Sequence, residues 1–209
     1  MLRLRSPVPF GKRALDVALS GVGLLVSLPI WMALAAAIKI EDGGPVFYTQ
    51  DRVGEGGKVF KVFKFRSMIV NAEAVVGALQ AAQADARITR IGRLMRATAM
   101  DELPQLLNIF RGDMTFVGPR ALRPGEIEAA GGAFIALEDV PGYEERTRLR
   151  PGLTGVAQIY APRDVGRRNK FRFDRVYAQR ESFWLDVRLI LLSFWITFRG
   201  RWEHRGQKV

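Results

Sequence analysis

The sequence predicts a mixed α/β fold dominated by helices. An uncharged apolar run covers residues 17–38, two aromatic and β-branched runs lie within 45–65, and helical apolar spacing recurs after residue 88. Strands do not alternate with helices along the chain, so a doubly wound parallel sheet is not expected. With 209 residues, the chain is expected to form one domain, residues 1–209.

The composition favours partners that carry negative charge. There are 32 Lys and Arg residues against 21 Asp and Glu, a net charge of +11, and 48% of residues are aliphatic or aromatic. This excess suits nucleic acid, acidic lipid headgroups or phosphorylated substrates. Cysteine is absent and His204 is the one histidine, which argues against Cys nucleophiles, His-based triads and multi-His metal sites. A bound metal is therefore expected to have oxygen ligands, as Mg²⁺ or Mn²⁺ does.

The first element is an apolar segment long enough to enter a membrane. As a helix, the 22 uncharged residues 17–38 would measure about 33 Å, against a hydrocarbon core of roughly 30 Å. Pro29 lies near the middle, and its missing N–H predicts a kink. Ser27, two residues earlier, can donate a hydrogen bond to a carbonyl that the kink frees.

Basic residues flank this segment on both sides. Lys12 and Arg13 precede it, and the basic remainder of the chain follows. Positive charge next to a membrane segment prefers the cytoplasmic side. A re-entrant helix-break-helix over residues 12–40 returns to the face it entered, so it satisfies both flanks. The alternative is a kinked transmembrane anchor.

Residues 45–65 predict a short β-hairpin. Val46–Thr49 and Lys58–Phe65 are rich in aromatic and β-branched residues, and the second run alternates Lys with apolar residues. The glycine-rich residues 54–57 between them are interpreted as the turn. A phosphate loop is the weaker interpretation because no helical pattern follows.

The remaining elements are predicted as helices. Their ranges are Asn71–Ala84, Ile88–Met100, Leu103–Phe110 and Phe171–Arg180. The arginines of Ile88–Met100 form a basic face that suits either anionic lipid or solvent. The mostly apolar Leu189–Phe198 is too short to span a membrane, so the segment 181–200 is expected to lie at the interface or to pack on the domain.

Asp101 and Glu102 are the candidate reactive pair. Two carboxylates at a helix start are ordinarily complements of the helix dipole, and Asp101 is an N-cap candidate. The arginines around them in sequence and the nearby helix N-terminus favour phosphate instead. Carboxylates, Mg²⁺ and arginines serve phosphoryl transfer, and an aspartate can itself attack phosphorus.

Several motifs occur together, in order, from Lys12 to about Arg199. They are Lys12-Arg13 with Asp16, Gly44–Phe47, Gln50–Gly54, Phe63–Met68, Asp101–Asn108, Arg111–Met114, Phe116–Arg120 and Arg150–Gly155. This set resembles the bacterial sugar transferases called monotopic phosphoglycosyl transferases. One departure lies at the membrane break, where the family often has Ser directly before the proline and this chain has Leu28 before Pro29.

The resemblance implies a reaction and its participants. A phosphosugar moves from a UDP-sugar to a polyprenol phosphate, usually undecaprenyl phosphate in bacteria, and UMP is released. By resemblance Asp101 is the nucleophile that forms a covalent phosphosugar intermediate, and Glu102 helps to hold Mg²⁺ with it or to handle charge. Cationic candidates for phosphate binding are Lys64, Arg66, Arg111, Arg120 and Arg150.

The resemblance also implies a location. The protein is expected at the cytoplasmic face of the bacterial inner membrane, monotopic, among membrane lipids. A re-entrant hairpin at residues 12–40, a cytosolic catalytic part at 41–180 and an interfacial or packing helix at 181–200 would make up a single catalytic domain, which starts polysaccharide or glycoconjugate assembly.

A second hypothesis comes from the charge alone. A membrane-anchored basic protein that binds nucleic acid or acidic lipid would also carry +11 with interleaved aromatic residues. Nucleic acid is not the expected partner, because no helix-turn-helix, zinc-finger or RNA-recognition pattern occurs and the basic residues are spread along the chain.

Overall fold

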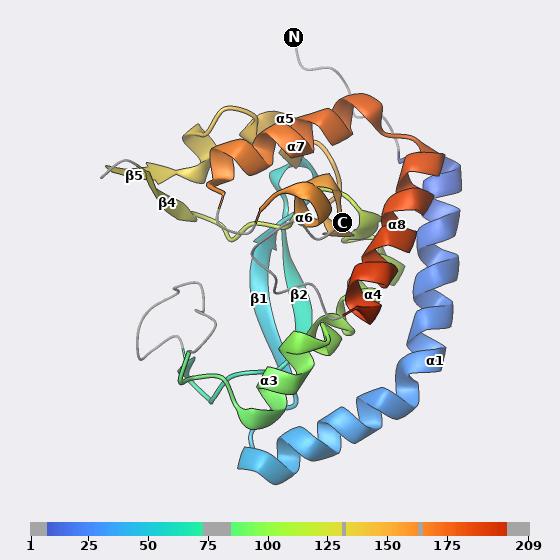
Figure 1. Cartoon of the computed structure of the whole chain (residues 1–209), viewed down its shortest axis with the longest axis vertical. Coiled ribbons are helices and arrows are strands. Elements are labelled where there is room, and N and C mark those ends of the chain that lie inside the picture. The colour runs from blue at the N-terminus through green and yellow to red at the C-terminus, as the bar shows by residue number, and fades with distance from the viewer. Residues whose placement is uncertain (1–7, 73–84, 131–132, 163–164, 200–209) are drawn as a thin grey trace.

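The computed structural model describes residues 8–72, 85–130, 133–162 and 165–199. It confirms a helix-dominated mixed fold, in which the described strands form three two-stranded sheets (Figure 1). The helices are α1 (Phe10–Asp42), α3 (Arg90–Ala97), α4 (Gln105–Arg111), α5 (Tyr143–Thr147), α6 (Val156–Tyr160), α7 (Arg167–Arg180) and α8 (Phe183–Phe198). The strands are β1 (Phe47–Val53), β2 (Val59–Phe65), β3 (Thr115–Val117), β4 (Ile127–Ala130), β5 (Ala133–Ala136) and β6 (Gly152–Thr154). The helix expected at Asn71–Ala84 falls almost entirely outside the described residues.

Helix α1 is long and bent. It follows one side of the molecule and then turns across its lower end (Figure 1). Pro29 lies inside it and has no N–H for the carbonyl of Leu25, which accounts for a kink. The expected helix-break-helix is therefore a continuous helix with a bend. Ser27 donates to the carbonyl of Leu24 at 3.4 Å, one residue before the carbonyl that Pro29 leaves free.

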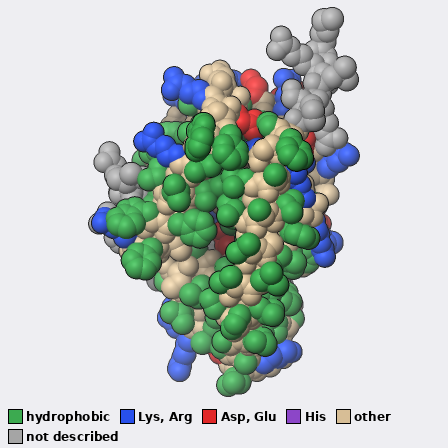
Figure 2. Space-filling model, turned by 90° about the vertical axis from the view of Figure 1, so that its right-hand side faces the viewer, with side chains coloured by type: hydrophobic (Ala, Val, Ile, Leu, Met, Phe, Trp, Pro, Cys, Tyr) green, Lys and Arg blue, Asp and Glu red, His purple; other side chains and the backbone are tan. Residues whose placement is uncertain are grey.

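Much of α1 exposes apolar side chains. Leu25 and Val26 are 76% and 72% exposed, and only 17% of the most apolar stretch of the helix is buried. Figure 2 shows a broad hydrophobic surface on the side of the molecule where α1 and α8 lie. Among the described residues, α1 is the one helix long and apolar enough to cross a membrane.

Strands β1 and β2 form the predicted hairpin. They are antiparallel, with Phe47 opposite Phe65 and Val53 opposite Val59. The glycine-rich segment between them is a turn, as expected, and includes Gly56 in the left-handed region at φ 68°. Val62 and Phe65 are buried, so one face of β2 contributes to the core.

Strands β3 and β6 form a parallel pair that the sequence did not predict. Thr115 lies opposite Gly152 and Val117 opposite Thr154. A Cβ on Gly152 would come within 2.1 Å of the Gly118 nitrogen, so only glycine allows the two backbones to approach so closely. The pair brings together the motifs Phe116–Arg120 and Arg150–Gly155. Arg120 lies in the loop that follows β3.

A short 3-10 turn, η2 (Met100–Glu102), connects α3 to α4. The helices predicted at 88–100 and 103–110 are present with shorter bounds. The N-cap prediction for Asp101 is wrong, because Asp101 lies inside η2 and Pro104 occupies the N-cap position of α4. The Asp101 side chain is thus not used to cap a helix.

Helix α8 packs on the domain through one face. Leu189, Ile190 and Ile196 are buried in the main core together with Ile109 of α4 and Phe116 of β3. The opposite face exposes large side chains. These are Trp184, Leu191, Phe194, Trp195 and Phe198.

A buried polar network, here called the anchor cluster, joins the start of α1 to three other elements. It consists of Lys12, Tyr177 and Asp186. Lys12 Nζ donates to Tyr177 Oη at 2.6 Å, to Asp186 Oδ2 at 2.7 Å and to the Val117 carbonyl at 2.9 Å. Tyr177 Oη donates to Asp186 Oδ1 at 2.7 Å. The network ties α1 to β3, α7 and α8.

Arg13 makes a second link between α1 and the domain. Its guanidinium donates to the carbonyls of Ile109 and Phe110, each at 2.7 Å. These carbonyls lie at the C-terminal end of α4, where a helix leaves its carbonyls without internal partners and favours a cation. Arg13 therefore holds α4, and the turn that precedes it, against α1.

Candidate active site

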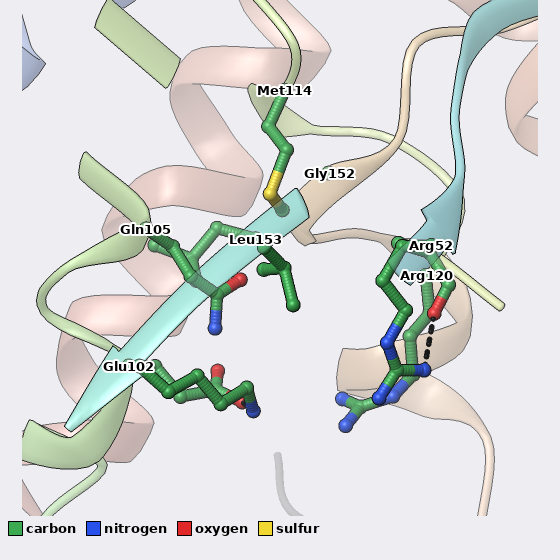
Figure 3. A pocket seen from close by; sticks show the side chains of 10 residues that line it. Arg52, Glu102, Gln105, Met114, Arg120, Gly152 and Leu153 are labelled. Carbon is green, nitrogen blue, oxygen red and sulfur yellow. Dashed lines mark hydrogen bonds and ion pairs between the residues drawn. The ribbon is translucent and has the colours of Figure 1, made fainter. Parts of the chain in front are cut away.

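A cavity lies where β2, α4 and the β3–β6 pair meet. Its lining residues are Arg52, Val62, Lys64, Glu102, Gln105, Met114, Arg120, Ala121, Gly152 and Leu153. Figure 3 shows Glu102 and Gln105 on one side of the open space and Arg52 and Arg120 on the other. The cavity thus has a carboxylate on one wall and two guanidinium groups facing it.

Glu102 forms an ion pair with Lys64. Lys64 Nζ donates to Glu102 Oε1 at 2.5 Å, and the two side chains are 25% (Glu102) and 20% (Lys64) exposed. Burial alone would raise the pKa of Glu102, but Lys64, Arg120 and Gln105 outweigh it and hold this pKa well below its usual value. Glu102 is accordingly a carboxylate at neutral pH and gives this wall a negative charge.

Asp101 is more deeply buried than its neighbour. Its residue exposure is 9%. Burial raises the pKa of Asp101 to about 6, with Lys64 opposing the rise and Glu102 adding to it. At neutral pH Asp101 is therefore ionised, yet its oxygen is more basic than that of an ordinary aspartate. Those two properties together suit a nucleophile.

The turn that presents the two carboxylates is strained at Ala99. Ala99 has φ 56° and ψ 17°, in the left-handed region that a residue with a Cβ rarely adopts. Its carbonyl accepts the Glu102 N–H at 3.2 Å and so closes the turn. Such strain costs on the order of 1–3 kcal/mol and is concentrated at functional sites.

Arg96 is a further cation near Asp101; it is one of the arginines around the pair in the sequence, but it was not among the predicted phosphate-binding residues. Its charge lowers the pKa of Asp101, and its Nε donates to Ser67 Oγ at 2.9 Å. A Cβ on Gly92 would lie 2.0 Å from the Ser67 carbonyl oxygen, so glycine allows α3 to come this close. That close approach, which helical spacing does not reveal, brings Arg96 to the carboxylates.

Arg52 is a site residue that sequence reasoning missed. It lies in the Gln50–Gly54 motif, to which no role was given. Arg52 Nη1 donates to the Ala121 carbonyl at 3.1 Å and Nη2 to Gln50 Oε1 at 2.6 Å. Its position in that motif was the available signal.

Three of the five predicted phosphate-binding cations do not line this cavity. Arg66 is buried and forms an ion pair with Asp42 at the end of α1, with Nε and Nη1 making no hydrogen bond within the described chain. Arg111 lies over the Phe63 ring, 5.3 Å from its centre. Arg150 pairs with Glu55 at 3.1 Å. Lys64 and Arg120 are the two that the fold brings together.

The donor groups fit a divalent cation in part. No cluster of three or more His, Cys, Asp or Glu side chains occurs within the described parts of the chain. Asp101 and Glu102 are nevertheless adjacent carboxylates, and Glu102 lines the cavity opposite Arg52 and Arg120. Mg²⁺ commonly binds through one or two carboxylates and takes its remaining ligands from water and substrate phosphate, so the pair suits Mg²⁺ in the presence of a phosphorylated substrate.

Fold and cavity together describe a protein with a large exposed apolar face and a cavity in which two arginines lie opposite a glutamate. The chain belongs to the bacterial sugar transferase family, which it matches over residues 8–200. This family membership confirms the resemblance noted in the motifs.

Curated relatives of the chain have names that describe sugar-phosphate transfer. It is 40% identical over 187 residues to the undecaprenyl-phosphate glucose phosphotransferase of Komagataeibacter xylinus, covering 87% of this chain and 35% of the relative. It is 37% identical over 201 residues to the UDP-N-acetylgalactosamine-undecaprenyl-phosphate N-acetylgalactosaminephosphotransferase of Aeromonas hydrophila, covering 94% and 46%. It is 40% identical over 184 residues to the exopolysaccharide production protein PSS of Rhizobium leguminosarum bv. phaseoli, covering 86% and 90%. The chain thus spans less than half the length of the first two relatives.

Proposed function

We propose that this protein transfers a phosphosugar from a UDP-sugar to a polyprenol phosphate, with undecaprenyl phosphate as the expected acceptor, and releases UMP. The observation that carries the proposal is the Asp101–Glu102 pair, of which Glu102 lines a cavity opposite Arg52 and Arg120, in a chain of the bacterial sugar transferase family. The names of the relatives supply the donor and acceptor classes. The product is the lipid-linked sugar from which a polysaccharide or glycoconjugate is assembled.

In the first displacement, an Asp101 oxygen attacks the phosphorus attached to the sugar. A bond forms between that oxygen and phosphorus, and the bond from phosphorus to the oxygen that bridges the diphosphate breaks. The electron pair leaves with UMP. The raised pKa of Asp101 supports this role, because a basic carboxylate is a better nucleophile than an ordinary one and is still ionised at pH 7.

In the second displacement, an oxygen of the polyprenol phosphate attacks the same phosphorus. The bond between phosphorus and Asp101 breaks and the carboxylate is restored, which yields a polyprenyl diphosphate sugar. Glu102 and Lys64, paired at 2.5 Å, lie beside Asp101 and hold a fixed charge arrangement through both steps. Two displacements at one carboxylate replace a single, more difficult transfer.

Asp101 and Glu102 are also the proposed ligands of Mg²⁺, with Mn²⁺ as a substitute. When bound, the ion neutralises charge on the phosphoryl oxygens. The low pKa of Glu102 keeps this group ionised and ready to bind a cation.

For the membrane, we propose a monotopic, re-entrant arrangement at the cytoplasmic face of the bacterial inner membrane. Both ends of α1 contact the same domain: Lys12 joins the anchor cluster, while Leu34 and Ile38 pack with Phe65 and Met95. A helix that crossed the bilayer would place its two ends on opposite sides. The exposed apolar middle of α1 and the exposed face of α8 support insertion into one leaflet, with residues 41–180 in the cytosol.

Family membership favours this enzyme over the basic binding protein that the charge alone also allows. The anionic groups at the wall formed by Arg52 and Arg120, here called the arginine wall, are then substrate phosphates, and nucleic acid has no part in the reaction.

The direct test measures UMP release from a panel of UDP-sugars by the purified protein with Mg²⁺ and undecaprenyl phosphate. Mass spectrometry of the protein, quenched after mixing with donor alone, should find a phosphosugar on the peptide that contains Asp101. Asp101→Asn should abolish both signals, and Asp51→Asn, at an exposed ion pair with Lys61, should change neither. Full turnover by Asp101→Asn would refute the mechanism.

A further inference from the structure

Arg52 has a fixed orientation at the cavity. Its two terminal nitrogens donate to the Ala121 carbonyl and to Gln50 Oε1, at 3.1 and 2.6 Å. In Figure 3 its guanidinium lies next to that of Arg120, across the open space from Glu102. Two hydrogen bonds hold the group before any ligand arrives, so little side-chain entropy is lost when a ligand binds.

The positive charge at this wall is poorly balanced. Both acceptors of Arg52 are neutral. The negative charge of Glu126 raises the pKa of Arg52. The Glu126 carboxylate, however, already accepts a hydrogen bond from Arg167 Nη2 at 2.5 Å. Burial, with the charges of Arg120 and Arg123, lowers the pKa of Arg52 to about 10. An anion between Arg52 and Arg120 would relieve that repulsion, and a phosphate matches the donor fork of guanidinium.

The position of Arg52 along the hairpin distinguishes between the two phosphate-bearing substrates. The ring of Trp31 in α1 lies 5.9 Å from that of Phe47 and 5.3 Å from that of Phe65, at one end of the hairpin. Arg52 pairs with Phe60 near the opposite end. Arg52 lies five residue steps along the strand from Phe47, roughly 17 Å at about 3.3 Å per step.

Lys64, the partner of Glu102, is next to Phe65 and therefore nearer to the α1 end of the hairpin. The reacting carboxylates thus lie between the apolar helix and the arginine wall. With α1 in the membrane, a lipid phosphate would approach them from the side of α1, which leaves the wall of Arg52 and Arg120 for the water-soluble substrate.

We infer that Arg52 is a further substrate-binding residue, which together with Arg120 holds the nucleotide phosphate that departs with UMP. The inference rests on the proposed function and assigns this wall to the donor and leaving group. Arg52 does not touch the reacting carboxylates, so its contribution is to bind and position the nucleotide.

The test measures UMP and uridine binding to the full chain in nanodiscs with Mg²⁺, by isothermal titration calorimetry. Arg52→Gln should weaken UMP binding about 10- to 100-fold, as expected for lost hydrogen bonds to a charged group. Uridine binding should be unchanged, because it has no phosphate. Arg52→Lys, which keeps the charge but loses the fork, should give an intermediate loss. Arg148→Gln, at an exposed ion pair with Glu144, serves as the matched control and should leave both affinities unchanged.

Steady-state kinetics gives a second measurement. In Arg52→Gln the KM for the UDP-sugar should rise, while the KM for undecaprenyl phosphate should stay at the wild-type value. Unchanged UMP affinity, equal weakening of UMP and uridine, or a rise confined to the lipid KM would each overturn the inference. If the wild-type protein neither binds UMP nor uses any UDP-sugar, the proposed function itself fails; if it does both and Arg52→Gln matches it, only this inference fails.

Discussion

The anchor cluster and the cavity both contain charged groups removed from water, but their charges are arranged differently. In the anchor cluster Lys12 has three hydrogen-bond acceptors, and Asp186 receives bonds from both Lys12 and Tyr177. In the cavity, Glu102 is paired with Lys64. On the opposite wall the guanidinium groups of Arg52 and Arg120 lie next to each other, and the hydrogen-bond acceptors of Arg52 are neutral. The first cluster is satisfied within the chain; the second favours an anionic ligand.

This difference indicates that the anchor cluster stabilises the fold and that the cavity binds a ligand. A satisfied buried network fixes how elements meet, and removing one partner leaves an uncompensated charge. An unbalanced cluster contributes little to the fold, because its favourable interactions require a substrate. We therefore expect substitutions in the anchor cluster to act on stability and those in the cavity to act on turnover.

The largest expected effect is the loss of turnover in Asp101→Asn. Removing the nucleophile should lower kcat by at least about 10³-fold. The stability of Asp101→Asn at pH 7, by contrast, should not fall. The pKa of Asp101 is raised in the folded state, so its contribution to stability is present at acid pH and is lost as pH rises toward about 6. At pH 7 the variant should melt no lower than wild type; a large fall in melting temperature would contradict the comparison.

The next effect is the destabilisation of Lys12→Met. Asp186 would be left buried with one partner fewer, at a cost of about 3–5 kcal/mol, or a fall in melting temperature of about 6–20 °C. Differential scanning fluorimetry in nanodiscs measures it. The double variant Lys12→Met with Asp186→Asn should recover part of the loss, since the buried carboxylate of Asp186 is then removed as well. Equal melting temperatures for the wild type and Lys12→Met would show that the network does not stabilise the fold.

A third effect concerns pH. Since burial raises the pKa of Asp101 to about 6, kcat/KM should be flat near pH 7.5 and fall about tenfold per unit below about pH 6, as the nucleophile becomes protonated. The measurement is the pH profile of UMP release. An acidic limb near pH 4, the range of an ordinary aspartate, would show that Asp101 is not the group that titrates.

The smallest effect is expected for Lys64→Met. Lys64 lowers the pKa of both Asp101 and Glu102. Without it both values should rise, which moves the acidic limb of the profile to higher pH and lowers turnover at pH 7 about tenfold. Lys61→Met, on the same strand in an exposed pair with Asp51, is the control and should keep the wild-type profile. An acidic limb that does not move would mean that Lys64 has no electrostatic role.

Much of this site could be predicted from the sequence because its signals are local. Asp101 and Glu102 are adjacent, and the hairpin that carries Lys64 has strong alternation and a glycine-rich turn. The β3–β6 pair escaped prediction because three-residue strands carry almost no periodicity. Arg52 was missed because it lies on β1, far from Asp101 in the sequence. Arg96 lies near Asp101 in the sequence but was given no role, because its position depends on the close packing of α3 against Ser67.

The sequence by itself determined that a long apolar segment with a central proline precedes a basic domain, and that two neighbouring carboxylates start its most distinctive motif. Only the tertiary structure decided which cations meet those carboxylates. Lys64 and Arg120 line the cavity, whereas Arg66, Arg111 and Arg150 contact Asp42, Phe63 and Glu55. The sequence gives the sign of each side chain's charge. The strength of an electrostatic interaction depends on distance and burial, which are set only when segments far apart in the chain pack together.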